Sequence, residues 1–209
     1  FGIITSDNQE SRVQKIVNDI NDYSPDSEIV VVGGSDMYNN VKHIHFDETK
    51  KSGWITRKKN LVTKYASNEN IVYMHDYITI DKNWNDGWEW FGDNWDICMT
   101  AVNNPDGTRF RDWCAWDDPD LCYLPSGQHW ACLVPYSYSK KEYMYISGAY
   151  WVAKKSVMEE EPLNEELCWG EAEDVEWSYR IRKKFKYKMN PYSIVKLLKQ
   201  KDVILKDKS

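Results

Sequence analysis

The chain has 209 residues, with 27 lysines and arginines against 33 aspartates and glutamates, and a formal net charge of −6. The length favours one domain with a real core, and the acidic balance argues against non-specific nucleic-acid binding, which needs a basic surface. No apolar run approaches the ~18 residues that cross a bilayer, and the first residues already resemble a strand, so no signal peptide is visible. The chain could have been trimmed from a longer protein.

The first 80 residues alternate between strand and helix patterns. Val13, Ile16 and Ile20 recur at helical spacing, whereas residues 28–32 form the continuous β-branched run of a strand covered on both faces. The predicted elements are strands at residues 2–5, 28–32 and 71–74 and helices at residues 9–23 and 56–67. This β-α-β order predicts parallel strands and a nucleotide-binding half over residues 1–80.

Polar residues follow each of the three predicted strands. They are Thr5, Ser6 and Asp7 after the first strand, residues 33–35 after the second, and His75 and Asp76 after the third. Ligands of such α/β sheets bind beyond the carboxyl ends of the strands. We therefore expect a binding site at this edge of the sheet.

Residues 81–138 are rich in tryptophan, aspartate, asparagine, glycine and proline, with one predicted strand at residues 96–102. Most of the 11 tryptophans fall between Trp84 and Trp130. So many large rings cannot all be buried. They indicate either an aromatic core under long loops or a surface on which sugar rings stack, and the sequence leaves both interpretations open.

The last third of the chain returns to regular patterns. Residues 143–153 predict a strand, a turn at Ser147 and Gly148, and a second strand, and residues 173–185 predict a helix. Residues 190–209 are basic and partly apolar. This tail is typical either of a final helix or of a strand that leads out of the domain.

The cysteines are odd in number, and no two of them have C-x-x-C spacing: Cys98, Cys114, Cys122, Cys132 and Cys168. A zinc ribbon is therefore not expected. Reduced thiols in a cytosol-like, cytoplasmic compartment are favoured over a disulfide framework.

Adjacent carboxylates, Glu173 and Asp174, stand at the predicted start of a helix, shortly after Gly170. The helix dipole favours acidic residues in any first turn, which is a sufficient structural explanation in many proteins. A nearby glycine, however, lets a ligand approach the backbone. A carboxylate placed there can take a proton from a bound hydroxyl, so the pair is a candidate catalytic site.

Asp76 is the second candidate carboxylate. At the carboxyl end of a buried strand it can hold a divalent cation that binds a diphosphate, or it can simply cap a turn. His75 could add a ligand for Mn²⁺, although a lone histidine is more often structural. Arg57, in the polar segment 57–60, lies either on a solvated helix face or at a helix N-terminus that grips a phosphate or nucleobase.

The order of these motifs resembles that of the GT-A glycosyltransferases that use nucleotide sugars, especially the large family-2-like group. Residues 53–60 (GWITRKKN) precede a strand that ends in a metal motif of the D-x-D type, here within residues 71–78 (IVYMHDYI). A glycine-containing strand pair follows at residues 146–151 (ISGAYW). Residues 169–180 (WGEAEDVEWSYR) are then similar to a W-G-x-x-E-D element and a helix bearing S-x-R.

The resemblance implies a single GT-A domain over residues 1–209, with an α/β architecture: a Rossmann-like mixed sheet flanked by helices, and the tryptophan-rich region as a loop insertion. Acceptor binding and catalysis would belong to residues 81–190, and residues 191–209 would be a tail. The implied activity moves a sugar from a nucleotide-diphosphate sugar, with a UDP-sugar favoured, to a hydroxyl of a glycan or glycoprotein acceptor. The anomeric carbon would be inverted.

The resemblance also implies residue roles. Asp174 would be the base that deprotonates the acceptor hydroxyl, and Glu173, Trp169 and Gly170 would contact the acceptor. The implied donor contacts are Thr5, Ser6 and Asp7 with the nucleoside, Arg57 with the base or phosphates, Gly148 with a sugar, and Asp76 and His75 with Mn²⁺ or Mg²⁺ on the diphosphate.

Three departures from the family pattern bear on metal dependence and nucleotide identity. The metal motif contains the single aspartate Asp76. Gly33 and Gly34 stand where many relatives have a strand-end aspartate that grips uracil. No histidine follows Asp174 to serve as a late metal ligand.

Two other functions remain open at this point. A nucleotidyltransferase that makes nucleotide sugars shares an α/β half and metal carboxylates, but it should have a glycine-rich basic loop after the first strand, where this chain has residues 5–9 (TSDNQ). A non-catalytic carbohydrate-binding module would explain the tryptophans and would not need Asp174.

Overall fold

The computed structural model describes residues 1–35, 38–122, 131–202 and 206–207. Its helices are α1 (Glu10–Tyr23), α2 (Ile55–Tyr65), α3 (Trp84–Phe91), α4 (Lys155–Glu160) and α5 (Glu173–Ile181), with a short 3-10 helix, η1 (Lys141–Tyr143). The strands are β1 (Gly2–Ile4), β2 (Val30–Val32), β3 (Lys42–Ile44), β4 (Asn70–His75), β5 (Ile78–Ile80), β6 (Ile97–Asn103), β7 (Cys114–Trp116), β8 (Ala131–Leu133), β9 (Met144–Tyr145), β10 (Tyr150–Lys154), β11 (Tyr187–Leu197) and β12 (Lys206–Asp207).

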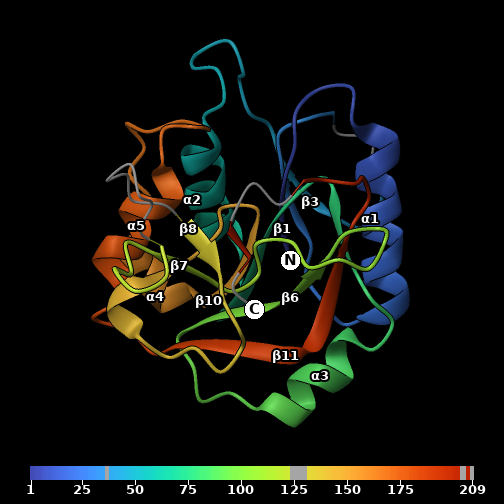
Figure 1. Cartoon of the computed structure of the whole chain (residues 1–209). Helices are drawn as coiled ribbons and strands as arrows, with labels where there is room; N and C mark the ends of the chain where they lie inside the picture. The colour runs from blue at the N-terminus through green and yellow to red at the C-terminus, as the bar shows by residue number, and fades with distance from the viewer. Residues whose placement is uncertain (36–37, 123–130, 203–205, 208–209) are drawn as a thin grey trace.

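The described residues form a central sheet in the order β3-β2-β1-β4-β10-β6-β11-β5 and a smaller sheet in the order β12-β8-β7-β9. The first four strands of the central sheet are parallel, as the β-α-β pattern predicts. Helices α1 and α2 lie on either side of these strands (Figure 1). Gly2 lets α2 approach β1 closely, because a Cβ there would lie 2.0 Å from Cγ1 of Val62.

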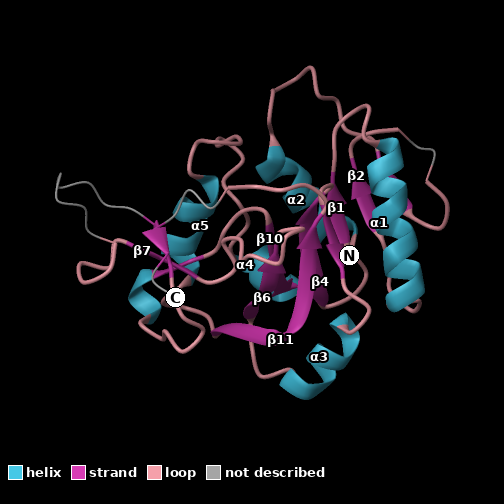
Figure 2. Cartoon of the chain, turned by 45° about the vertical axis from the view of Figure 1, so that its right-hand side comes forward, coloured by secondary structure: helices cyan, strands magenta, loops and turns pink. Residues whose placement is uncertain are grey.

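The other half of the central sheet is mixed. Strand β10 runs antiparallel to both β4 and β6, and β11 runs parallel to β6 and antiparallel to β5 (Figure 2). The residues from 190 onward, predicted as a final helix or an exit strand, therefore continue β11 inside the sheet as far as Leu197. This agrees with the expected mixed sheet flanked by helices.

The predicted strand–turn–strand at residues 143–153 is confirmed as β9, a turn and β10, but the two strands do not pair with each other. Strand β9 pairs with β7 of the smaller sheet, whereas β10 pairs with β4 and β6 of the central sheet. The turn at Ser147 and Gly148 is thus a crossing between two sheets. Sequence periodicity shows where strands lie but not which partners they take, so this crossing had no signal in the sequence.

The tryptophan-rich region is more regular than predicted, since it contains α3, β7 and β8 in addition to β6. Helix α3 packs closely on β11, where a Cβ on Gly87 would lie 2.4 Å from Oγ of Ser193. The tryptophans that are buried in the core are Trp84, Trp95, Trp113, Trp151 and Trp177. Among the described tryptophans, Trp90 and Trp169 are the strongly exposed ones, so the aromatic-core interpretation accounts for most of them. Trp130 lies outside the described residues.

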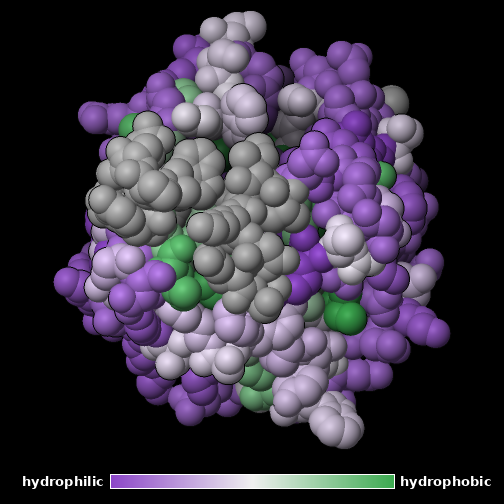
Figure 3. Space-filling view, viewed as in Figure 1, coloured by the Kyte–Doolittle hydropathy of each residue, from purple (hydrophilic) through white to green (hydrophobic). Residues whose placement is uncertain are grey.

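None of the helices in the described ranges is long and apolar enough to span a membrane. The coloured residues on the face shown in Figure 3 are mostly hydrophilic, with small separate hydrophobic patches. The apolar side chains of β1, β2 and β4 are instead buried in the central core.

Candidate active site

Two cavities adjoin at the carboxyl edge of the parallel strands. The strand-end cavity, about 640 Å³, is lined by Thr5, Ser6, Asp7 and Asp76 among others. The carboxylate cavity, about 390 Å³, is lined among others by Gly148, Glu173 and Asp174. The residues that line both cavities are His75, Tyr77, Trp169 and Lys201. Asp76 and Asp174, which lie about a hundred positions apart in the sequence, therefore line two neighbouring cavities that share these four residues.

The strand-end cavity follows directly from the parallel pairing of β1 and β4. Ile4 is in register with His75, so the next residues, Thr5 and Asp76, leave the sheet side by side. Oγ1 of Thr5 donates a hydrogen bond of 2.8 Å to Oδ2 of Asp76. Nη1 of Arg12, from α1, lies 3.6 Å from Oδ1 of the same carboxylate. Asp76 thus has a polar partner on each oxygen.

Lys58 supports the same edge from α2. Its side chain is buried, donates a hydrogen bond of 2.5 Å to the carbonyl oxygen of Thr5, and forms an ion pair with Glu48. The charge of Lys58 is therefore already compensated, and its role is to fix the backbone that carries Thr5.

Asp174 is the second residue of α5, which begins at Glu173 directly after Ala172. Ala172 adopts a left-handed conformation with φ 59°. Oδ2 of Asp174 accepts two hydrogen bonds of 2.8 Å, from the hydroxyl of Tyr145 and from the backbone N–H of Gly148. These donors come from β9 and from the crossing between the two sheets. They orient the carboxylate toward the cavity, where a base must meet its substrate.

Glu173 is buried beside Asp174, with 6% of its surface exposed. Burial and the neighbouring charge of Asp174 raise the pKa of Glu173. Nζ of Lys59, from α2, donates a hydrogen bond of 2.6 Å to the carbonyl oxygen of Gly148 and lies 4.5 Å from the centre of the Trp151 ring. Burial lowers the pKa of Lys59 to about 8, although Glu173 and Asp174 act in the opposite direction.

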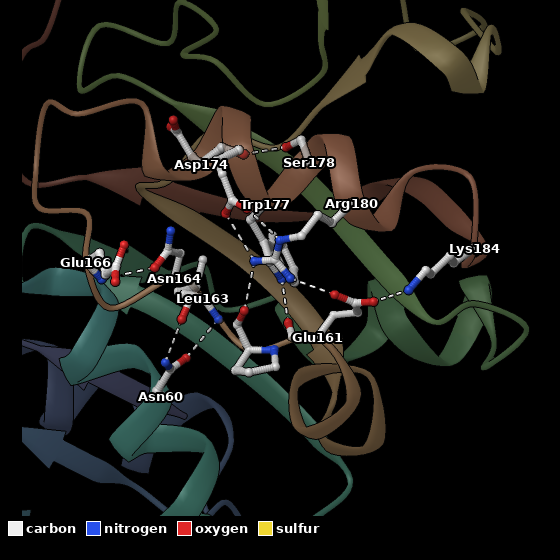
Figure 4. A network of polar contacts seen from close by, with 12 residues as sticks. Asn60, Glu161, Leu163, Asn164, Glu166, Asp174, Trp177, Ser178, Arg180 and Lys184 are labelled. Atoms are coloured by element: carbon white, nitrogen blue, oxygen red, sulfur yellow. Dashed lines mark hydrogen bonds and ion pairs between the residues drawn. The ribbon is translucent and has the colours of Figure 1, made fainter.

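The S-x-R pattern of α5 has a structural role (Figure 4). Ser178 accepts a hydrogen bond of 2.9 Å from the backbone N–H of Ile146 and donates one of 2.6 Å to the carbonyl oxygen of Asp174. Arg180 pairs with Glu176 and Glu161, each at 2.6 Å. The side chain of Asp174 points away from this network in Figure 4. The network therefore fixes the helix that presents the carboxylate.

Arg57 is not among the residues that line the two cavities. Its guanidinium pairs with Glu165 at 2.9 Å, and Trp54 donates a hydrogen bond of 2.7 Å to the carbonyl oxygen of the same residue. Arg57 thus docks the segment before α5, and its predicted contact with the donor stays a prediction.

The two predicted acceptor residues differ in their placement. The ring of Trp169 is 73% exposed and lines both cavities, and its backbone N–H donates a hydrogen bond of 2.8 Å to the carbonyl oxygen of Gly53. Gly170 lines neither cavity and makes a turn with φ 83°. Gly170 therefore shapes the chain next to the site, and Trp169 is the residue that faces it.

Comparisons with known proteins find similarity in structure. GalNAc-T7, solved with UDP, GalNAc and Mn²⁺, matches with a TM-score of 0.64 and 14% identity, over 94% of this chain and 42% of that chain. S. aureus TarS 1-349 matches with a TM-score of 0.59 and 14% identity, over 93% of this chain and 59% of that one. Its complex with UDP-GlcNAc matches with a TM-score of 0.57, over 97% and 60% of the two chains. The chain has the GT-A fold.

No protein-family model matches the chain, and no curated protein matches it by sequence. The GT-A fold here is therefore recognisable from the arrangement of the elements and from short motifs. The chain spans about two fifths of GalNAc-T7 and three fifths of TarS 1-349. The expected order of the elements, from the strand-end residues to the E-D helix entry, agrees with this fold.

The GT-A neighbour GalNAc-T7 was solved with Mn²⁺, but the predicted metal ligands of this chain do not fit a divalent cation. In the described part of the chain, no group of three or more His, Cys, Asp or Glu side chains could hold a metal ion. The rings of His75 and Tyr77 pair with each other at 5.3 Å, whereas Asp76 is engaged by Thr5 and Arg12. A lone carboxylate that an arginine already compensates has little attraction left for a second cation.

Several residues of the cleft were not predicted from the sequence. Tyr145 holds Asp174, and Lys59 holds the backbone of Gly148. Lys201 and Arg111 line the carboxylate cavity. Lys59 stood in a segment already noted as polar, but the other three belong to regions whose pairing only the structure shows.

Proposed function

We propose that the chain is a glycosyltransferase that moves a sugar from a nucleotide-diphosphate sugar, with a UDP-sugar favoured, to a hydroxyl of a glycan or glycoprotein. The observation that carries this proposal is the pair of adjoining cavities. Thr5 and Asp76 line one of them, and the oriented carboxylate of Asp174 lines the other. The named contents of the neighbouring structures, UDP with GalNAc and UDP-GlcNAc, support the same donor class.

The donor would lie with its nucleoside in the strand-end cavity, against Thr5, Ser6 and Asp7. Its diphosphate would reach the junction of the two cavities, and its sugar would enter the carboxylate cavity near Gly148. This order follows from the sizes and linings of the two cavities. The polar strand ends suit a nucleoside, and the carboxylate pair suits the hydroxyl groups of sugars.

Transfer would be a single displacement. The acceptor hydroxyl gives its proton to Asp174 while its oxygen bonds to the anomeric carbon, and the bond from that carbon to the diphosphate oxygen breaks with its electron pair on the diphosphate. Attack from the face opposite the leaving group inverts the anomeric centre, as in other single displacements at sugars. The buried Glu173 would hydrogen-bond the acceptor, and the exposed ring of Trp169 would stack against it.

The proposal is tested with a panel of nucleotide sugars and the variant Asp174→Asn. A donor at ~100 times its dissociation constant adds about 2.7 kcal/mol to stability, which raises the Tm of a chain of this size by roughly 5–10 °C. Asp174→Asn should keep this shift but lose transfer by about 10²–10⁴-fold, the usual contribution of a general base. Transfer is measured as UDP release in the presence of glycan acceptors.

The matched control is Asp22→Asn, the same chemical change at an exposed aspartate of α1 outside both cavities. It should keep transfer. If no nucleotide sugar stabilises the protein, or if Asp174→Asn turns over like the wild type, the proposed function or the proposed base is wrong.

A further inference from the structure

The reaction proposed above leaves a diphosphate whose negative charge grows as the bond to the sugar breaks. Such a transition state needs positive charge placed in advance at the leaving group. In the described part of the cleft the protein offers no fitting cluster of metal ligands. The lysine and arginine side chains that line the two cavities are the remaining source of this charge.

Lys201 lies where the leaving group would be. It lines both the strand-end cavity and the carboxylate cavity. Its backbone N–H donates a hydrogen bond of 2.9 Å to Oδ1 of Asn104, and three residues earlier the backbone N–H of Leu198 donates one of 2.8 Å to the carbonyl oxygen of Tyr77. Nζ of Lys201 lies 3.5 Å from the centre of the Tyr77 ring. Backbone hydrogen bonds thus hold the segment after β11 against the cleft. They place the ammonium of Lys201 where the strand-end cavity meets the carboxylate cavity.

Two further cations stand close to Lys201. Nζ of Lys199 lies 5.3 Å from the centre of the Tyr77 ring, and Lys199 lines the strand-end cavity. Arg111 lines the carboxylate cavity, and its buried Nε has no hydrogen-bond partner within the described chain. None of the ion pairs found between described residues involves Lys199, Lys201 or Arg111. The three charges are therefore available to an anion.

We propose that Lys201, assisted by Arg111 and Lys199, binds the diphosphate of the donor and takes the place of a divalent metal ion in stabilising it as it leaves. The inference rests on the proposed function. It names the side chain that stabilises the diphosphate when the bond to the sugar breaks. Three cations around the junction also repel a divalent cation, which agrees with the poor fit of Asp76 and His75 to a metal.

The electrostatics of the cleft support this role. Burial, together with the charges of Lys199 and Arg111, lowers the pKa of Lys201 to about 8, and Asp76 opposes this shift. Glu173, Asp174 and Asp202 also line the carboxylate cavity with Lys201, and their charges oppose the binding of an anion there, whereas His75 and Tyr77, which line both cavities, add no charge. Burial and Lys59 hold the pKa of His75 well below its usual value, and burial raises the pKa of Tyr77 to about 12, so both rings are neutral near pH 7. A bound diphosphate relieves the repulsion among the cations, which is a driving force for binding it.

The test is the binding of UDP and of uridine, measured by calorimetry in EDTA and again with Mn²⁺. Wild type should bind UDP equally well in both conditions. Lys201→Met should lose UDP affinity by about 10–100-fold, the range for a hydrogen bond to a charged group, with no change for uridine, which has no phosphate. Lys183→Met is the matched control, since Lys183 is an exposed lysine outside the cavities, and it should bind UDP like the wild type.

The pH dependence of UDP binding by Lys201→Arg is a second measurement, and a folding defect would not mimic its expected result. Titration of UDP itself between pH 7 and pH 9 affects both proteins alike, but Lys201 loses its proton in the free wild-type protein over this range. Arginine stays charged throughout this range, so the wild-type affinity for UDP should fall relative to that of Lys201→Arg from pH 7 to pH 9.

Two results overturn the inference and leave the proposed function standing: UDP binding that EDTA abolishes and Mn²⁺ restores, or a Lys201→Met variant that binds UDP like the wild type. Absence of UDP binding under every condition would instead contradict the UDP-sugar transferase itself, and the inference with it.

Discussion

At the scale of single residues, Gly148 is the most constrained position of the site. Its backbone N–H donates to Asp174, its carbonyl oxygen accepts from Lys59, and a Cβ built on it would lie 3.0 Å from Oδ2 of Asp174 and 3.1 Å from Oε1 of Glu173. Its φ is not positive, so glycine is needed here for space and not for backbone conformation. The sequence showed a glycine in a turn, but not the carboxylates that lie against it.

Gly148→Ala should therefore displace the carboxylate of Asp174 while leaving the backbone unstrained. A displaced catalytic group lowers turnover, by up to about 10²-fold where the displacement reaches ~1 Å, and the crowding should cost about 1–3 kcal/mol of stability. Turnover and donor affinity are measured together, and the affinity should change much less than the turnover.

Gly107→Ala is the contrasting variant. Gly107 has φ 86° and open space around its Cβ position, so the change costs stability through backbone strain without touching the site. If both glycine variants turn over like the wild type, Gly148 does not set the position of Asp174.

At the scale of the elements, α2 links the two halves of the cleft. Lys58 reaches the backbone of Thr5, and the next residue, Lys59, reaches the backbone of Gly148. One turn of helix thus holds both cavities in place. From the sequence these lysines were equally consistent with a solvated helix face, because a buried lysine has no distinguishing pattern.

Lys59 gives α2 a measurable pH signature. Its pKa is about 8 in the folded protein against the ordinary value of 10.5, so between these values the unfolded chain binds the extra proton and folding stability rises with pH. Below pH 8 the cost of burying the charge is fully present, and above pH 10.5 it is gone. The wild-type free energy of unfolding should therefore rise relative to that of Lys59→Met by up to about 1.4 kcal/mol per pH unit within this window.

Urea unfolding at several pH values measures this difference, because groups common to both proteins cancel. Lys64→Met, which removes an exposed lysine from the same helix, should follow the wild-type pH dependence. Parallel curves for the wild type and Lys59→Met would show that Lys59 is not desolvated in solution.

Some of these helices and strands could be predicted from the sequence, and others could not. Periodicity and β-branched runs predicted β1, α1, β2, α2 and β4 to within a few residues, since buried parallel strands and amphipathic helices have strong local patterns. The E-D entry of α5 was equally visible. The crossing from β9 to β10, the strand partners of β11 and the helix α3 depend on contacts between distant segments, and local patterns do not encode these.

At the scale of the whole molecule, a further cavity of about 570 Å³ lies at the amino ends of β2 and β4, and among its described lining residues are Phe1, Trp84 and Trp95. No lysine or arginine is among those lining residues, and several carboxylates are. A diphosphate would be repelled there. The chemistry of an activated sugar belongs to the opposite edge, where the cations and the oriented carboxylate meet.

The most direct test is a crystal structure of Asp174→Asn bound to the nucleotide sugar that stabilises the protein most, since this variant should hold the donor without consuming it. We predict the nucleoside against Thr5, the diphosphate at Lys201, and the sugar in the carboxylate cavity with its anomeric carbon facing residue 174. A donor bound in the tryptophan-lined cavity, or a sugar turned away from residue 174, would contradict the account.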